Sequence, residues 1–299
     1  MRPQTTRPER FGEQASSEAD GAMTTKIAFQ GEPGSYSHQA CRETYPEMQP
    51  LSCRTFEDAI EAVREGRADL AMLPVDNSTF GRVADIHHLL PHSGLYIVGE
   101  AFVRVRINLL ALPGVPLSEI THAMSHTMLL GQCRRFLAAH GIHRVTGADT
   151  AGSARRVAEA GERHMAALAS ELAGEIYGLE TLARDIEDEG NNTTRFLVMS
   201  RAPDWRRRGD GPMITTFVFQ VRNIPAALYK ALGGFATNGV NMTKLESYMV
   251  GGSFQATQFY ADIEGHPEDP PVRRALEELD YFTSELTLLG VYPADRRRN

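Results

Sequence analysis

The sequence predicts an α/β protein made of a long unit of parallel sheets followed by a short unit of mixed α and β structure. Two observations predict the long unit: strand and helix patterns alternate over residues 26–200, and polar loops follow the strands. The short unit is predicted from a different order of elements over residues 213–293. Ligands of parallel sheets bind at the carboxyl ends of strands, so the polar loops are the first candidates for a site.

The first half of the long unit opens with a strand at residues 26–30, and a glycine-rich loop then leads into a helix near Ser37. Thr55 is the predicted N-cap of the next helix, because apolar residues recur on one helical face after it. A buried strand at residues 69–73 is expected to end in a polar loop at residues 74–78 (PVDNS).

The second half repeats this arrangement, with strands expected at residues 107–112 and 165–169. Its helices are expected to be capped at their starts by short polar side chains, namely Ser125-His126, Asp149-Thr150 and Ser170. Polar groups at helix starts can bind anions, because the free backbone N–H groups point outward there.

Residues 201–212 show no periodic pattern and are interpreted as a linker. The elements expected after it alternate as strand, helix, strand, strand, helix, strand: residues 213–221, 225–237, 241–250, 253–263, 270–279 and 284–291. Gly251-Gly252 is a hairpin-turn signal between the two middle strands. The order is that of a ferredoxin-like domain.

The overall composition excludes several classes of protein. A formal net charge of −7 argues against a nucleic-acid partner, and the chain has no apolar run long enough for a membrane span. Three cysteines without paired spacing argue against a disulfide framework, so a reducing, cytoplasmic compartment is expected. Residues 1–25 are polar and are expected to be a disordered extension, which leaves open whether translation starts at Met1 or Met23.

Neither a metal nor a nucleotide site is expected. His88 and His92 have a spacing that can chelate a metal on a helix, but Pro91 between them favours a surface loop. The loop around Gly31 and Gly34 is rich in glycine but lacks the lysine of a phosphate-binding P-loop.

The run Asn192-Thr193-Thr194-Arg195-Phe196 places an amide, a hydroxyl and a guanidinium within four residues. Arg195 can hold a carboxylate through two parallel hydrogen bonds, and Thr194 can donate one hydrogen bond and accept others. The same run also fits a loop whose threonine caps the backbone and whose arginine pairs with Asp188.

The sequence resembles the prephenate dehydratases in several blocks that occur in the family's order. The blocks are Gly31-x-x-Gly34-Ser35-Tyr36-Ser37-His38, Pro74-Val75-Asp76-Asn77-Ser78, Ser125-His126 with Gln132-Cys133, residues 166–179, and Asn192 to Phe196. Asp76 departs from the family, which has glutamate there. The resemblance covers nearly all of the chain after the extension.

The resemblance implies that residues 26–200 form a catalytic unit with the two-lobed fold of type 2 periplasmic binding proteins. The lobes would span residues 26–103 with 191–200, and residues 104–190, with the active site between them. The implied reaction is the loss of carbon dioxide and hydroxide from prephenate to give phenylpyruvate, in phenylalanine biosynthesis, without a cofactor or a metal.

The resemblance also implies roles for individual residues. Thr194, Arg195 and Asn192 are the catalytic candidates: Thr194 would stabilise the departing hydroxide, and Arg195 would bind the pyruvyl carboxylate. His126 is either a donor in the active site or only a polar residue of a first helical turn. The candidates for further hydrogen bonds to the substrate are Ser35, Ser37, Asn77, Ser78, Ser125, His126 and Thr150.

Residues 213–293 resemble an ACT regulatory domain, with Glu246-Ser247 matching part of its effector motif and alanine at 226 in place of the usual glycine. We expect L-phenylalanine to inhibit, with an affinity weakened by these changes. The candidates for its binding are Asn223, Ala227, Leu228, Asn241, Glu246 and Ser247. The alternative is a purely structural domain for dimerisation, and a homodimer or homotetramer is expected in either case.

Two other functions remain open from the sequence. Arogenate dehydratase runs the same chemistry on the corresponding amino acid, and a non-catalytic sensor could use the same two-lobed cleft. An assay with prephenate distinguishes all three.

Overall fold

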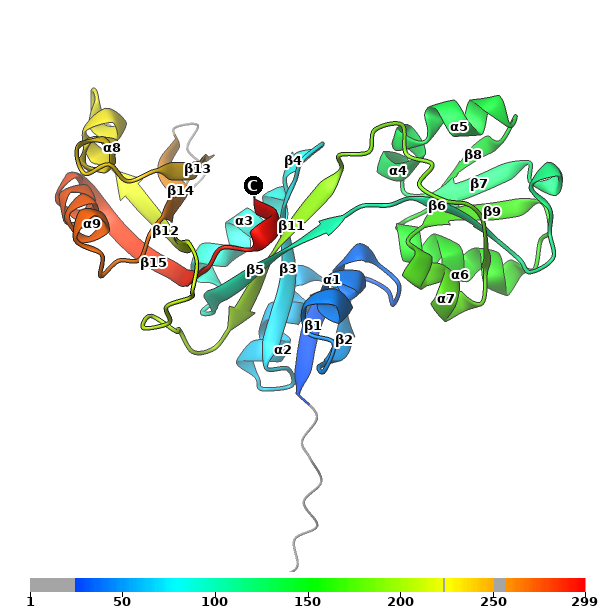
Figure 1. The fold of residues 1–299 in the computed structure, drawn as a ribbon, viewed down its shortest axis with the longest axis horizontal. Coiled ribbons are helices and arrows are strands. Elements are labelled where there is room, and N and C mark those ends of the chain that lie inside the picture. Colours follow the sequence, from blue (N-terminus) through cyan, green and yellow to red (C-terminus); the bar gives the residue numbers. More distant parts are fainter. Residues whose placement is uncertain (1–24, 223, 250–255, 299) are drawn as a thin grey trace, which may run out of the picture.

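The computed structural model describes residues 25–222, 224–249 and 256–298, which form two lobes and a C-terminal domain (Figure 1). Asn223, the Gly251-Gly252 turn and residues 1–24 of the predicted extension lie outside the described residues.

The first lobe is a sheet with the strand order β2-β1-β3-β11-β5. Its first three strands are parallel, and β11 is antiparallel to both of its neighbours. The strands are β1 (Lys26–Gln30), β2 (Gln49–Cys53), β3 (Leu70–Asn77), β5 (Tyr96–Arg104) and β11 (Thr193–Ser200), and a short β4 (Gly81–Arg82) pairs with β3. The helices are α1 (Tyr36–Thr44), α2 (Phe56–Arg64) and α3 (Ala84–Leu89).

Two segments of this lobe differ from the sequence-based expectation. Strand β3 continues to Asn77, beyond the predicted end at residue 73, because β11 pairs with it as far as Thr194↔Asn77. The surface loop expected around His88 and His92 is helical, since α3 is followed directly by a 3₁₀ turn at Leu90–His92 that accommodates Pro91.

The second lobe has a five-stranded sheet of order β10-β6-β9-β7-β8, joined to the first lobe by the segments after β5 and before β11 (Figure 1). Its strands are β6 (Asn108–Ala111), β7 (His122–Ser125), β8 (His143–Thr146), β9 (Met165–Ala169) and β10 (Glu180–Ala183). Its helices are α4 (Thr127–Gln132), α5 (Arg134–Ala139), α6 (Thr150–Ala160) and α7 (Glu171–Tyr177).

The predicted caps are found, but in each of the pairs Asp149-Thr150 and Ser125-His126 only one residue caps the helix. The side chains of Thr55, Asp149 and Ser170 accept hydrogen bonds from backbone N–H groups in the first turns of α2, α6 and α7. Of the pair Ser125-His126, only His126 caps α4, while Ser125 is the last residue of β7.

The C-terminal domain has the predicted order of elements: β12 (Met213–Val221), α8 (Ala227–Thr237), β13 (Met242–Met249), β14 (Ala256–Glu264), α9 (Pro270–Phe282) and β15 (Thr283–Pro293). Its antiparallel strands follow the order β13-β14-β12-β15. The helix starts at Ala227 and not at residue 225, because Ala226 has a φ of 62°, which is a left-handed conformation outside the helix.

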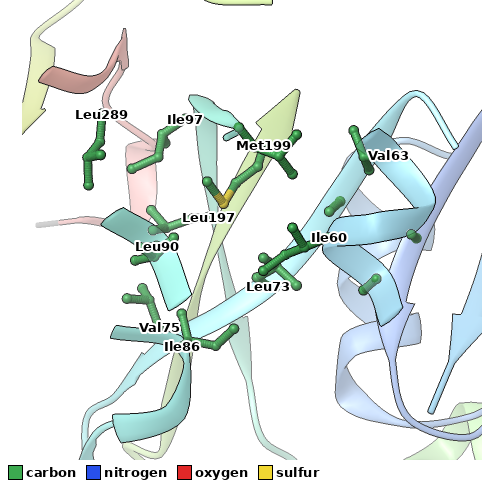
Figure 2. Packing of buried hydrophobic residues seen from close by; sticks show 14 of the residues in the cluster. Ile60, Val63, Leu73, Val75, Ile86, Leu90, Ile97, Leu197, Met199 and Leu289 are labelled. Carbon is green, nitrogen blue, oxygen red and sulfur yellow. The ribbon is translucent and has the colours of Figure 1, made fainter. Parts of the chain in front are cut away.

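The sheet of the C-terminal domain continues into that of the first lobe. Strand β15 lies parallel to β5 and meets it at Gly290↔Ile97. A Cβ atom on Gly290 would lie 2.2 Å from the carbonyl oxygen of Ile97, so this approach requires glycine. Figure 2 shows Leu289 of β15 in the same hydrophobic cluster as Leu73 and Leu197 of the first lobe, so the two units share one core.

A buried ion cluster lies at the same junction. The Arg195 side chain of β11 donates from Nε to Glu100 Oε2 (2.8 Å), from Nη1 to Asp262 Oδ2 (2.6 Å) and from Nη2 to the Tyr292 hydroxyl (3.0 Å). Arg298 lies 3.3 Å from Glu100 and 3.1 Å from Asp262. Because Arg195 is only 6% exposed, its charge depends on these partners, two of which belong to the C-terminal domain.

A second ion cluster at the junction surrounds Asp76 of β3. Lys244 Nζ of β13 lies 2.6 Å from Asp76 Oδ1, and the guanidinium of Arg195 lies 3.5 Å from Oδ2. Burial alone would raise the pKa of Asp76, but the contacts with His87, Lys244 and Arg195 outweigh it and lower the pKa to about 2. His87 links the same two units, since its Nδ1 lies 2.6 Å from the Tyr248 hydroxyl.

The close approach of β15 to β5 leads to the first prediction. Gly290→Ala should lower the free energy of unfolding by about 2–3 kcal/mol, because the added methyl group meets the Ile97 backbone. Gly233→Ala in α8 is the matched control, since nothing lies within 4 Å of the added atom there and helical alanine stabilises. Urea unfolding of the two variants measures the difference, and equal stabilities would show that the two sheets do not meet as described.

The second prediction follows from the lowered pKa of Asp76. A lowered folded-state pKa stabilises the protein above the unfolded pKa of about 4 and loses this effect as the pH falls toward 2. Asp76→Asn should therefore cost about 2 kcal/mol of unfolding free energy above pH 5, and progressively less below pH 4. Urea unfolding across this range, with the exposed Asp210→Asn as control, tests it; a cost that does not vary with pH would contradict the assignment.

Candidate functional site

A cleft of about 660 Å³ lies between the two lobes, at the carboxyl ends of β1, β2 and β3. It is lined by side chains from both lobes, and its apolar wall includes Pro74, Val105, Leu129 and Phe196. The polar lining includes most of the predicted site residues: Ser35, Ser37, Asn77, His126, Thr150, Asn192 and Thr194. The position at the strand ends is the one that the parallel topology predicts.

The lobes also touch beside the cleft, through the glycine-rich loop. Ser170 Oγ donates to the Gly34 carbonyl (2.5 Å), and the Tyr177 hydroxyl donates to the Pro33 carbonyl (2.8 Å). Gly34 has a φ of 90°, and a Cβ atom there would lie 2.7 Å from Ala173 Cα of α7. The loop therefore holds the two lobes together while its other residues face the cleft.

The hydroxyl of Thr194 is oriented by Asn77. Asn77 Oδ1 accepts from the backbone N–H groups of Thr79 (2.9 Å) and Phe80 (3.0 Å), which identifies its other side-chain atom as the donor. Asn77 Nδ2 then donates to Thr194 Oγ1 at 3.0 Å. Since Thr194 Oγ1 accepts this hydrogen bond, its own proton is free to point to a ligand in the cleft.

Asn192 extends the same network to the second lobe. Its Oδ1 accepts from Asn77 Nδ2 at 2.7 Å, so its Nδ2 is the donor, and this atom donates to Gln132 Oε1 at 3.0 Å. Gln132 Nε2 is buried and has no hydrogen-bond partner among the described residues. The two backbone N–H groups that donate to Asn77 thus fix the direction of each hydrogen bond in the series from Thr194 through Asn77 and Asn192 to Gln132.

Several helices begin at the cleft. Ser35 caps α1 and accepts from the His38 N–H, while Asp149 caps α6 directly before Thr150. His126 caps α4 by accepting from the Met128 N–H at 3.3 Å through Nδ1. In a neutral imidazole this leaves the proton on Nε2, so His126 can donate a hydrogen bond from that atom. The start of α1 favours an anion, because its N–H groups carry the positive end of the helix dipole, whereas the start of α6 is already occupied by the Asp149 carboxylate.

The structure corrects the role expected for Arg195. Its guanidinium lies in the buried ion cluster with Glu100 and Asp262 and does not line the cleft. The reason is the alternation of side chains along a strand: Asn192, Thr194 and Phe196 face the cleft, so Arg195 between them faces the opposite side of the sheet. Arg195 is therefore no candidate for the pyruvyl carboxylate in this arrangement.

Two predicted hydrogen-bonding residues also lie away from the cleft. Ser78 Oγ donates to the Asn191 carbonyl and accepts from the Thr193 N–H, so it fixes the segment before β11. Ser125 is fully buried, and its Oγ donates to the Leu168 carbonyl of the neighbouring strand. Both hydroxyls support the backbone of the site and are not free for a substrate.

The sequence analysis missed several residues that line the cleft. Arg54 follows β2, and Phe80 and Met128 are apolar side chains that are 46% and 39% exposed. None of them belongs to a recognised motif, although Arg54 shares with Gly31 and Asn77 the signal of a position at the carboxyl end of a strand.

The effector candidates lie on different faces of the C-terminal domain. Ala227 and Leu228 are half-buried and pack on the core under α8 and α9, which cover the face turned away from the first lobe (Figure 1). The carboxylate of Glu246 faces the first lobe instead, 3.3 Å from Lys244 Nζ and 3.5 Å from Arg82. Asn241 and Ser247 are exposed, and Asn223 lies outside the described residues.

Neither a metal-binding cluster nor a membrane-spanning helix is found in the part of the chain that the structure describes. No cluster of three or more histidine, cysteine or acidic side chains is placed to hold a metal ion there. Among the helices of residues 25–222, 224–249 and 256–298, none has the length and apolar character needed to cross a membrane.

Comparisons with known proteins identify relatives of the whole chain. A bifunctional N-acyl-homoserine lactone acylase/prephenate dehydratase from Komagataeibacter europaeus is 52% identical, over 90% of this chain and 95% of that protein. Arogenate dehydratase/prephenate dehydratase 1 from Arabidopsis thaliana is 37% identical, over 94% of this chain and 74% of that protein. The prephenate dehydratase of Arthrobacter aurescens, solved in complex with L-Phe, is 32% identical, with a TM-score of 0.82 over 90% of each chain.

The family model of prephenate dehydratase matches residues 27–204, which include both lobes and every residue of the cleft named above. The chain belongs to the prephenate dehydratase family.

Proposed function

We propose that this protein is a prephenate dehydratase that converts prephenate to phenylpyruvate in phenylalanine biosynthesis. The observation that carries the proposal is the hydroxyl of Thr194, which lies in the cleft with its acceptor side occupied by Asn77. Because the hydroxyl accepts from Asn77, its proton is free to donate, and a donor is what a departing hydroxide needs.

The reaction balances without a cofactor. The C–C bond to the ring carboxylate breaks and carbon dioxide leaves; the electron pair moves into the ring, and the C–O bond to the 4-hydroxyl breaks. Aromatisation supplies the driving force. Thr194 donates a hydrogen bond to the departing oxygen, which acquires a proton from water as it leaves, since a threonine hydroxyl does not ionise near neutral pH.

The apolar wall of the cleft suits the loss of the carboxylate. Val105, Leu129 and Phe196 offer no hydrogen bonds from their side chains to a carboxylate placed against them. Carbon dioxide is neutral, so an environment with little water favours it over the carboxylate that it comes from. The polar side of the cleft, with Asn192, His126 and Thr150, is left for the rest of the substrate.

The strongest test of this mechanism is Thr194→Val, which keeps the shape of the side chain and removes the donor. We expect the turnover number to fall about a hundredfold while the fold is retained, because one hydrogen bond to a developing charge is lost. Formation of phenylpyruvate, read from its absorbance in alkali, measures the turnover. A turnover number within about threefold of wild type would exclude Thr194 as the donor.

Asn77→Asp is a second variant that tests the same hydrogen-bond network. The aspartate keeps an acceptor for the Thr79 and Phe80 N–H groups but replaces the donor to Thr194 by a second acceptor. The Thr194 proton then binds to the aspartate and turns away from the cleft, so the turnover number should fall even though Thr194 is intact. Unchanged turnover would contradict the role of Asn77.

The names of relatives suggest two other activities, which can be measured alongside the turnover of prephenate. Arogenate carries an ammonium in place of the keto oxygen, and an acidic side chain would favour it. The acidic residues of the cleft are Glu32, 3.4 Å from Arg155, and Asp149, which caps α6. Since both have partners, we expect prephenate to be preferred, as a higher kcat/KM than for arogenate.

Amide hydrolysis, as in the name of the K. europaeus relative, rests on the 52% identity. A hydrolase needs an activated nucleophile, and the described cleft residues include no serine, threonine or cysteine that is hydrogen-bonded to a histidine side chain. Turnover of prephenate without release of an acyl chain from an N-acyl-homoserine lactone is the expected result. A non-catalytic sensor would turn over none of these compounds.

We further propose that the C-terminal domain is an ACT domain that senses L-phenylalanine, and that the chain works in the cytoplasm as a homodimer or homotetramer. The L-Phe complex of the A. aurescens relative supports the ligand. Strand β13 is at the edge of the sheet, with Leu245 39% and Met249 58% exposed, and a second subunit would cover it. Sedimentation equilibrium tests the oligomer.

An effector can act on the cleft only through contacts that differ between two states of the protein. The contact of Lys244 with Asp76 is suited to this, because Asp76 is next to Asn77 in β3. Lys244→Gln should leave calorimetric binding of phenylalanine within about threefold and make inhibition at saturation less complete. Lys230→Gln on the exposed side of α8 is the control.

Equal inhibition of the Lys244→Gln variant and the wild type would show that the coupling follows another path. A wild-type protein that neither binds millimolar phenylalanine nor is inhibited by it would leave the C-terminal domain as an assembly domain only.

A further inference from the structure

The acidic side chains that line the cleft have partners within the protein, whereas its arginine has no ion-pair partner among the described residues. Glu32 pairs with Arg155 at 3.4 Å, and Asp149 Oδ1 accepts from the Gly152 N–H at 2.6 Å, so both acids are occupied. Arg54 is the one lysine or arginine among the described residues that line the cleft, and it forms no ion pair with a described carboxylate. Its side chain is exposed, and its positive charge is available to a ligand.

The backbone around Arg54 is held on both sides. Before it, the Cys53 carbonyl accepts from the Gly31 N–H at 3.0 Å, and Ser52 Oγ donates to the Gly31 carbonyl at 2.5 Å. After it, Thr55 caps α2 by accepting from the Asp58 N–H at 3.1 Å. The side chain therefore projects from a fixed position beside the glycine-rich loop, at the carboxyl end of β2.

We propose that Arg54 binds the carboxylate of the substrate that the reaction retains, the one on the pyruvyl side chain; this inference rests on the proposed function. A cation in the cleft favours binding of a substrate with two carboxylates, and Arg195, which the sequence suggested for this role, is occupied in the buried ion cluster. A guanidinium suits a carboxylate, because it offers two parallel hydrogen bonds with the charge.

The chemistry decides between the two carboxylates. The ring carboxylate loses its charge as carbon dioxide leaves, so a cation bound to it would stabilise the substrate more than the transition state and slow the reaction. The pyruvyl carboxylate keeps its charge throughout, so a cation there binds substrate and transition state equally. Arg54 thus contributes to KM and not to kcat.

The test compares Arg54→Gln and Arg54→Lys with Arg64→Gln, a control at the far end of α2 whose arginine is exposed and pairs with Glu61. We expect Arg54→Gln to raise KM for prephenate at least about tenfold with kcat within about twofold, because a charge-assisted pair is lost. Arg54→Lys should recover part of the loss, since it keeps the charge without the fork, and Arg64→Gln should change neither constant.

An unchanged KM in Arg54→Gln overturns the proposal. A kcat that rises together with KM overturns the assignment to the pyruvyl carboxylate, because it shows that Arg54 stabilises the group that leaves. Calorimetry with prephenate separates this result from a failure of the proposed function, using Thr194→Val with and without Arg54→Gln. Binding weakened about tenfold by the second substitution supports Arg54 even if turnover is absent, whereas equal binding refutes it.

Discussion

The buried guanidinium of Arg195 is the interaction on which the arrangement of the whole chain depends. A buried cation is tolerated only with close counter-charges, and here Glu100 belongs to the first lobe while Asp262 belongs to the C-terminal domain. Separating the units would take Asp262 and the Tyr292 hydroxyl away from Arg195 and leave it with Glu100 and Asp76 of the first lobe. The two units are therefore obliged to stay in contact, which is a stronger constraint than the linker between them provides.

The same residue also connects that junction with the cleft. Arg195 lies between Thr194 and Phe196 on β11, so one strand lines the cleft on one face and carries the ion cluster on the other. A displacement of Asp262 would act on β11 directly, without an intermediate element. Asp76 and Asn77 repeat this arrangement on β3, where Lys244 contacts the first and Thr194 the second. The cleft and the junction thus share two neighbouring strands, β3 and β11.

Local patterns predicted the elements well, because they depend on residues that are close in sequence. The caps at Thr55, Asp149 and Ser170 are examples, since each needs only a short polar side chain before a helical apolar pattern. The roles within the Asn192–Phe196 run were predicted less well. The resemblance identified the residues of the motif but not the face of the strand on which each side chain lies. Because side chains alternate along a strand, Thr194 lies on the cleft face and Arg195 on the opposite face. Pairing across long sequence separations, such as Gly290 with Ile97, leaves no local pattern that could have predicted it. Arg54 was missed for another reason: it stands outside every motif, and only the folded cleft shows that it forms no ion pair within the described part of the chain.

The continuous sheet has a consequence for how this protein can be divided. Strand β5 is paired with β11 on one side and meets β15 at Gly290↔Ile97 on the other, so cutting the chain in the segment after β11 would uncover this side of β5 and the hydrophobic cluster that Leu289 shares with the first lobe. Open strand edges of this kind pair with other chains and aggregate. The catalytic lobes are therefore not a detachable module, and a chimaera that exchanges the C-terminal domain must also carry over a strand with glycine opposite Ile97.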